Sequence, residues 1–86
     1  MKRTLIFANE AREDFLYWRD TDRSLLRRIN QLIKDVRRSP YEGIGKPESL
    51  KHQLAGWWSR RIDSQHRMIY RVTEPSIEIA HLRHHY

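Results

Sequence analysis

The side chains that could do chemistry together are a carboxylate, several cations and an imidazole in the second half of this 86-residue sequence. They match the needs of phosphodiester transfer in RNA. That reaction requires a base for the 2′-OH proton, cations for the charge that develops on the phosphate, and an acid for the leaving 5′ oxygen. RNA carries its own nucleophile, so no Ser or Cys is needed. The candidates are Glu48 as base, His85 as acid, Arg61 and Arg67 as phosphate ligands, and Lys46 and Lys51 as further cations.

The surroundings of the candidates favour these roles. Glu48 lies between Lys46 and Lys51, and such cations keep a carboxylate ionised, as a base must be. A histidine that titrates near neutrality is a suitable acid. Each residue also has an ordinary structural interpretation. A lone Glu is often a solvated loop carboxylate, Arg61 and Arg67 could be exposed strand residues, and a terminal histidine pair is often part of a frayed end.

Metal and cofactor chemistry is not expected. The sequence has no Cys, and neither HExxH nor the phosphate-binding GxxxxGK[ST] pattern occurs. His84 and His85 are adjacent, so on a strand they point to opposite faces. His81 and His85 would share a face but lie about 13 Å apart. We therefore predict a site without a metal.

The composition indicates a polyanionic partner. The chain has 17 Lys and Arg against 11 Asp and Glu, a formal net charge of +6. Clustered cations gain affinity by displacing counterions from phosphates, and the three Trp and four Tyr could stack on bases. The absence of Cys favours a reducing cytoplasm. No segment resembles a signal peptide or a membrane span, so no membrane partner is expected.

Hydrophobic spacing predicts one α+β domain over residues 1–86. Residues 5–7 form a first strand. Two helices follow, the first with an apolar face and Asn9 as its cap, the second with a broad apolar stripe opposite a basic face. The apolar faces are Ala8, Ala11, Phe15 and Trp18 in the first helix, and Leu25, Leu26, Ile29, Leu32, Ile33 and Val36 in the second. The basic face contains Arg23, Arg27, Lys34 and Arg38. The segment 20–22 separates the helices and caps the second, which ends at Ser39-Pro40.

The remainder predicts a loop followed by an antiparallel meander. Two Gly and a Pro indicate a loop over residues 41–49. Strands are expected over residues 57–62, 67–73 and 77–84, with a further short strand near 53–54. The fold class is therefore α+β, with an N-terminal strand, a two-helix hairpin packed on one face, and an antiparallel β-meander.

Five segments of the sequence carry a more specific pattern: DFLYWRDTD, INQLIKDVRRSPYEGIGKPESLKH, LAGWWSRRI, QHRMIYRVT and the closing RHHY. Together they resemble the YoeB-type messenger-RNA interferase toxins of the RelE/ParE superfamily, nearly end to end. The resemblance implies a RelE-like fold and a toxin that cuts messenger RNA in the A site of the ribosome. It also implies inhibition by a YefM-type antitoxin and allows a homodimer.

The resemblance assigns roles by position. Glu48 of KPE corresponds to the general base, Arg67 of the HR pair to the phosphate clamp, and His85 of the final HY to the general acid. Arg61 is a further cation and Tyr86 helps to position the nucleotide. The positions of Lys46 and Lys51 imply contacts with RNA phosphates.

Three alternatives stay open on the sequence. His84 stands where the family pattern leads us to expect Tyr, so it could share or replace the role of His85. A basic module that binds RNA or the ribosome without cutting would explain the charge equally well. Inhibition of DNA gyrase, as in ParE-like members, would not need the set of Glu, Arg and His.

Overall fold

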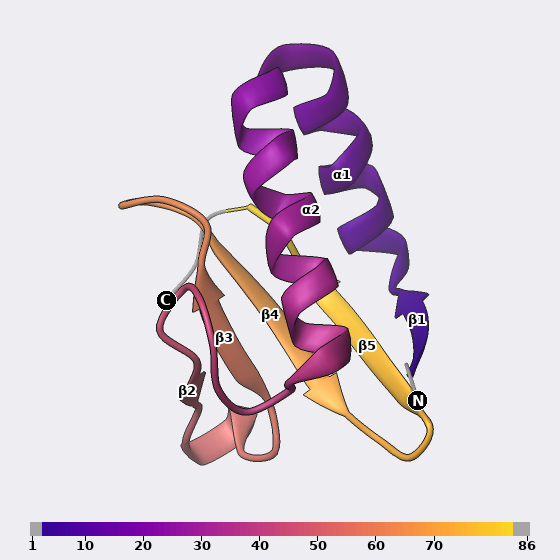
Figure 1. Ribbon diagram of the computed structural model, residues 1–86, viewed down its shortest axis with the longest axis vertical. Coiled ribbons are helices and arrows are strands. Elements are labelled where there is room, and N and C mark those ends of the chain that lie inside the picture. The colour runs from indigo at the N-terminus through magenta and orange to yellow at the C-terminus, as the bar shows by residue number, and fades with distance from the viewer. Residues whose placement is uncertain (1–2, 84–86) are drawn as a thin grey trace.

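The computed structural model describes residues 3–83, and in it two helices lie on one face of a five-stranded sheet (Figure 1). The chain begins with β1 (Thr4–Phe7) and continues into α1 (Asn9–Thr21) and α2 (Arg23–Arg38). The other elements, in chain order, are β2 (Glu48–Ser49), a 3₁₀ helix (His52–Leu54), β3 (Trp58–Arg61), β4 (Arg67–Val72) and β5 (Ser76–His81). The expected α+β order of strand, helical hairpin and meander is confirmed.

The sheet has the strand order β1-β5-β4-β3-β2. Its four later strands are antiparallel neighbours, as a meander requires. β1 instead lies parallel to β5, so the sheet is mixed. The apolar run at residues 5–7 predicts a strand, but it does not show which strand becomes the partner.

Both helices pack an apolar stripe against the sheet. In α2 the buried apolar residues are Ile29, Leu32, Ile33 and Val36, as the spacing predicted. Asp22 caps this helix, because its carboxylate accepts a hydrogen bond from the Leu25 N–H at 3.0 Å. The predicted cap of α1 is wrong. Ala8 occupies the cap position without a side-chain bond, and Asn9 lies inside the helix.

Alternation along the strands separates a core face from an open face. Met68 and Tyr70 of β4 are fully buried in the core beneath the helices, and Trp58 of β3 packs against them. The intervening side chains of the same strands point to the other side of the sheet. Trp57 and Trp58 therefore face opposite ways. The open face carries the predicted site residues of the strands.

Three predicted boundaries need correction. A short strand was expected near residues 53–54, but these residues belong to the 3₁₀ helix, whereas Glu48–Ser49 at the end of the predicted loop pairs with β3. The last strand ends at His81 and not near residue 84. Two-residue strands carry too little alternation to be recognised, and their existence depends on the neighbour with which they pair.

Candidate functional site

The candidate site lies on the open face, where three neighbouring strands bring distant residues together. Glu48 of β2 is directly opposite Ser59 of β3, and Arg61 of β3 is directly opposite Arg67 of β4. Directly opposed residues project from the same face of a sheet, with Cβ atoms about 5 Å apart. The strand register therefore gathers a carboxylate, a hydroxyl and two guanidinium groups within a small area.

Arg67 contacts the candidate base directly. Its Nη1 lies 3.5 Å from Oε1 of Glu48 and donates to Oγ of Ser59 at 3.4 Å. The Glu48 side chain is 66% exposed and that of Arg67 is 23% exposed. A pair this exposed contributes only about 0–1 kcal/mol to stability. The arrangement leaves the carboxylate accessible to a ligand while a cation lies beside it.

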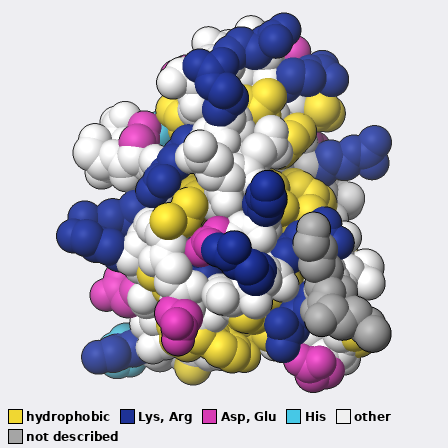
Figure 2. Space-filling model, viewed as in Figure 1, with side chains coloured by type: hydrophobic (Ala, Val, Ile, Leu, Met, Phe, Trp, Pro, Cys, Tyr) yellow, Lys and Arg dark blue, Asp and Glu magenta, His cyan; other side chains and the backbone are white. Residues whose placement is uncertain are grey.

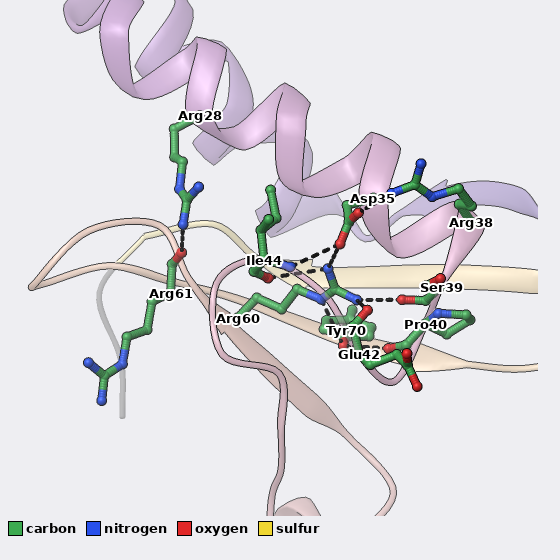
Figure 3. A network of polar contacts seen from close by, with 10 residues as sticks. All are labelled: Arg28, Asp35, Arg38, Ser39, Pro40, Glu42, Ile44, Arg60, Arg61 and Tyr70. Carbon is green, nitrogen blue, oxygen red and sulfur yellow. Dashed lines mark hydrogen bonds and ion pairs between the residues drawn. The ribbon is translucent and has the colours of Figure 1, made fainter.

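The remaining predicted cations surround this pair. Lys46 and Lys51 are exposed on either side of β2, and Arg61 is exposed at the end of β3. The Arg61 side chain points away from α2, although its carbonyl oxygen accepts a hydrogen bond from Arg28 (Figure 3). Glu48 forms its ion pair with Arg67. The predicted partners Lys46 and Lys51 are not the cations that contact it.

The predicted acid and the predicted nucleotide contact, His85 and Tyr86, lie outside the described residues, as does His84. Leu82, which precedes them in the sequence, is hydrogen-bonded to α1. The Leu82 N–H donates to the Asp14 carboxylate at 3.0 Å, and the Leu82 carbonyl accepts from the Trp18 indole at 2.9 Å. All three residues are buried. α1 thus satisfies both backbone polar groups of Leu82.

A second buried residue links this anchor to β4. The Trp18 ring packs edge-on against the His66 ring with centroids 4.8 Å apart, and His66 immediately precedes Arg67. Tyr17, the neighbour of Trp18, lies beneath the Arg83 guanidinium at 3.8 Å. One turn of α1 therefore contacts both the start of β4 and the segment that follows β5.

Arg60, which was not among the predicted site residues, makes many hydrogen bonds near the site (Figure 3). It is fully buried on the helix side of β3, where its Nη1 pairs with Asp35 of α2 at 2.6 Å. The same guanidinium donates to the backbone carbonyls of Ser39, Glu42 and Ile44. Three carbonyls of the loop after α2 are thereby tied to β3, only a few residues before Glu48.

The loop can approach Arg60 this closely because of its glycines. Gly45 has a φ of +82°, and a Cβ there would lie 2.8 Å from Leu32 and 3.2 Å from the Cβ of Arg60. The Gly45 carbonyl accepts from the Arg61 N–H at 2.7 Å, which joins the loop to β3 directly. The glycines of the GIG segment therefore allow a positive φ and a close approach of the loop to β3.

Asp35 and Tyr70 complete the network around Arg60. Burial raises the pKa of the Asp35 carboxyl, but hydrogen bonds from Arg60, from the Ile44 N–H and from Arg38 outweigh it, so the pKa lies below its usual value. Burial raises the pKa of the Tyr70 hydroxyl, with Arg60 acting in the opposite direction. This hydroxyl accepts from Arg60 at 3.2 Å and donates to the Pro40 carbonyl at 2.7 Å.

Two signals in the sequence could have revealed this network. Asp35 lies between Leu32 and Val36 on the apolar side of an amphipathic helix, where a carboxylate needs a buried partner. Arg60 and Arg61 are adjacent in a strand, so one of them must point toward the helices. Neither signal shows by itself that Arg60 is the inward residue.

The outer side of α2 carries a basic surface, here defined as Arg23, Arg27, Lys34 and Arg38. All four are exposed, as their position opposite the apolar stripe predicted. Figure 2, viewed from the helix side, shows Lys and Arg side chains over much of this face. A shallow depression beside the helix is lined by Arg27, Asn30, Gln31 and Lys34. Amide and cationic side chains around a depression suit a polyanionic ligand.

Two further observations concern residues 3–83 alone. No group of three or more His, Asp or Glu side chains in this part of the chain is arranged to hold a metal ion. None of its helices is long and apolar enough to cross a membrane.

The sequence is similar to a family of bacterial toxins. A sequence model described as a YoeB-like toxin of a bacterial type II toxin–antitoxin system matches residues 7–86. The chain is 55% identical over 82 residues to toxin YoeB of Escherichia coli K12, which covers 95% of this chain and 98% of that protein. It is 46% identical over 84 residues to toxin RelK of Mycobacterium tuberculosis, covering 98% and 99%.

Solved structures of similar chains point to the same family. A YoeB dimer from Staphylococcus aureus superposes with a TM-score of 0.93 at 40% identity, covering all of both chains. A heterotetrameric YoeB–YefM toxin–antitoxin complex from the same organism gives a TM-score of 0.90 at 40% identity, also over both full chains. This chain belongs to the YoeB family of toxins from type II toxin–antitoxin systems.

The buried ion pair generates a stability prediction. Changing Asp35→Asn removes the charge opposite the buried Arg60, so we expect the free energy of unfolding to fall by about 3–5 kcal/mol. Because the pKa of Asp35 is lowered in the folded state, its stabilising contribution is present above its unfolded value near 3.9 and is lost as the pH falls through the folded value. Urea titrations of the wild type and of Asp35→Asn between pH 7 and 3 measure the free energy of unfolding and its dependence on pH.

Asp20→Asn is the matched control, because Asp20 pairs with Arg19 on the surface and both side chains are more than half exposed. That change should alter the free energy of unfolding by at most about 1 kcal/mol. Equal losses in the two variants would contradict a special role of the buried pair.

Proposed function

We propose that this protein is a ribosome-dependent endoribonuclease that cuts messenger RNA in the A site and so inhibits translation. The observation that carries the proposal is the contact of 3.5 Å between Glu48 and Arg67 on the open face of a YoeB-family toxin. A carboxylate that can accept the 2′-OH proton lies beside a cation that can bind the adjacent phosphate. Both groups are accessible to a strand of RNA.

The proposed reaction uses Glu48 and Arg67 at these positions and His85 as the acid. Glu48 takes the proton from the 2′-OH, the 2′ oxygen attacks phosphorus, and Arg67 stabilises the charge on the non-bridging oxygens. The bond to the 5′ oxygen breaks, and His85 gives its proton to that oxygen. The products are a 2′,3′-cyclic phosphate and a free 5′-OH. Arg61, Lys46 and Lys51 bind neighbouring phosphates, Tyr86 positions the nucleotide, and no metal takes part.

The proposed setting is the cytoplasm, where the whole chain acts as one domain under the control of an antitoxin. The Staphylococcus aureus relative forms a heterotetramer with YefM and also a dimer. We propose that a YefM-type antitoxin inhibits this chain as well, and that a homodimer is a further state. The sequence identity of 40% over both full chains supports the proposal that this chain makes the same two interactions as the Staphylococcus aureus relative.

Glu48→Gln tests the base. The amide keeps the size of the side chain but cannot accept the 2′-OH proton, so we expect cleavage to slow by about 10²-fold or more. Primer extension on a translated messenger maps the new ends. Glu42→Gln is the matched control, because Glu42 lies exposed in the same loop and it is its carbonyl that Arg60 contacts.

Wild type and Glu42→Gln should give the same ends at the same rate. An unchanged rate in Glu48→Gln would remove that residue from the mechanism, whereas the absence of new ends with wild type would favour a module that binds without cutting. EDTA should leave the chemical step unchanged once ribosome integrity is controlled. Strong inhibition under that control would contradict cleavage by side chains alone.

The acid is tested by comparing His85→Gln with His84→Gln. A neutral amide cannot deliver the proton, so we expect His85→Gln to slow cleavage by about 10²-fold while His84→Gln remains close to wild type. The measurement is the single-turnover rate on programmed ribosomes between pH 5.5 and 8.5. The reverse pattern would assign the proton to His84.

The basic surface of α2 should contact ribosomal RNA phosphates. We expect the double variant Arg27→Ala and Lys34→Ala to bind ribosomes more weakly, and to reduce the slope of log affinity against log salt by about one unit per cation removed. Arg38 is left in place because it is bonded to Asp35 at 2.8 Å. Arg12→Ala, an exposed cation of α1, is the control. An unchanged affinity at moderate salt in the double variant would refute the contact.

A further inference from the structure

An aromatic–cation pair lies on the open face beside the candidate site. Trp57 immediately precedes β3, and the guanidinium carbon of Arg71 in β4 lies 4.5 Å from the centre of the Trp57 ring. Glu78 of β5 accepts from Nε of Arg71 at 3.1 Å and from Nη2 at 2.6 Å. The three side chains come from neighbouring segments and form one ordered group.

This group is not part of the core. The Arg71 and Glu78 side chains are 43% and 32% exposed, and Trp57 is half-buried. The core cluster lies on the helix side, where Trp58 packs. A partly exposed tryptophan with a guanidinium over its ring contributes little to stability. It does present the two planar surfaces on which nucleobases stack, an aromatic ring and an Arg plane.

The register places this group close to the proposed reaction. Trp58 is opposite Tyr70, so the preceding Trp57 is opposite Arg71 on the open face. Ser59, the partner of Glu48 and of Arg67, is two residues from Trp57 along the chain. Two residues of extended strand span about 7 Å. Stacked nucleotides rise about 3.4 Å each, so a strand of RNA bound at Glu48 reaches Trp57 within about two nucleotides.

The hydrogen bonds of Arg71 favour a base over a phosphate as the ligand. Glu78 engages the Nε and Nη2 edge of the guanidinium and offsets its charge, which weakens the attraction of Arg71 for a phosphate. The planar faces are what the pair can offer. We propose that Trp57 and Arg71 form a stacking subsite for a nucleobase one or two nucleotides from the cut phosphate. The proposal rests on the proposed function and names a specificity-determining part of the same site.

The test combines protein variants with abasic nucleotides. The messenger carries 2′-O-methyl groups across the A-site codon, so it can be bound but not cut, and one nucleotide at a time lacks its base. Binding of labelled protein to ribosomes programmed with each messenger is measured by fluorescence anisotropy. With wild type we expect one position at which loss of the base weakens binding about 10-fold.

The variants decide whether Trp57 reads that base. Trp57→Ala should bind the intact messenger about 10-fold more weakly and should show no further loss at the sensitive position, because base and ring form one interaction. Trp57→Phe keeps an aromatic ring and should restore most of the affinity, which a loss of folding would not allow. Tyr41→Ala is the control, since Tyr41 is 53% exposed and packs on Trp58 at 5.0 Å on the helix side.

Three results would overturn the subsite. The first is wild-type affinity of Trp57→Ala for the intact messenger. The second is that the abasic nucleotide weakens binding of Trp57→Ala by the same factor as it weakens binding of wild type. The third is that no abasic position weakens binding of wild type. The outcome is separate from that of the proposed function. If messengers with free 2′-OH groups yield no new ends but the abasic pattern persists, the ribonuclease fails and the stacking subsite stands.

Discussion

The structure depends most on the ion pair between Asp35 and Arg60. A guanidinium with no exposed surface is tolerated only where charge and hydrogen bonds surround it. Its partners come from three elements: the carboxylate of α2, the hydroxyl of β4 and the carbonyls of the loop between α2 and β2. That loop carries Lys46 and leads into Glu48. The position of the candidate base therefore depends on a charge on the opposite side of the sheet.

The two faces of the sheet use polar interactions differently. On the helix side the polar groups are buried and fully bonded, so they resist change. On the open face the pairs Glu48–Arg67 and Arg71–Glu78 are partly exposed, so water and salt weaken them and each partner can exchange its contact for a ligand at small cost. A ligand can thus enter between Glu48 and Arg67 without breaking a contact on which the fold depends.

Much of this arrangement could be predicted from the sequence, and the failures have a common cause. The α2 stripe, the Asp22 cap and the order of elements are local patterns, and they were predicted correctly. The contact between Glu48 and Arg67 depends on a two-residue strand that no local pattern reveals. The inward Arg60 and the parallel β1 also depend on partners far along the chain.

The bonds of Leu82 to Asp14 and Trp18 have a geometric consequence for the end of the chain. The backbone is therefore fixed on α1 at Leu82, and the next residue, Arg83, places its guanidinium 3.8 Å from the ring of Tyr17 in the same helix. The first helix contributes no candidate catalytic group, but it determines where the backbone at Leu82 lies, three positions before His85 in the sequence. A displacement of α1 by one turn would shift the position of Leu82 by about 5.4 Å, which is more than the length of a hydrogen bond.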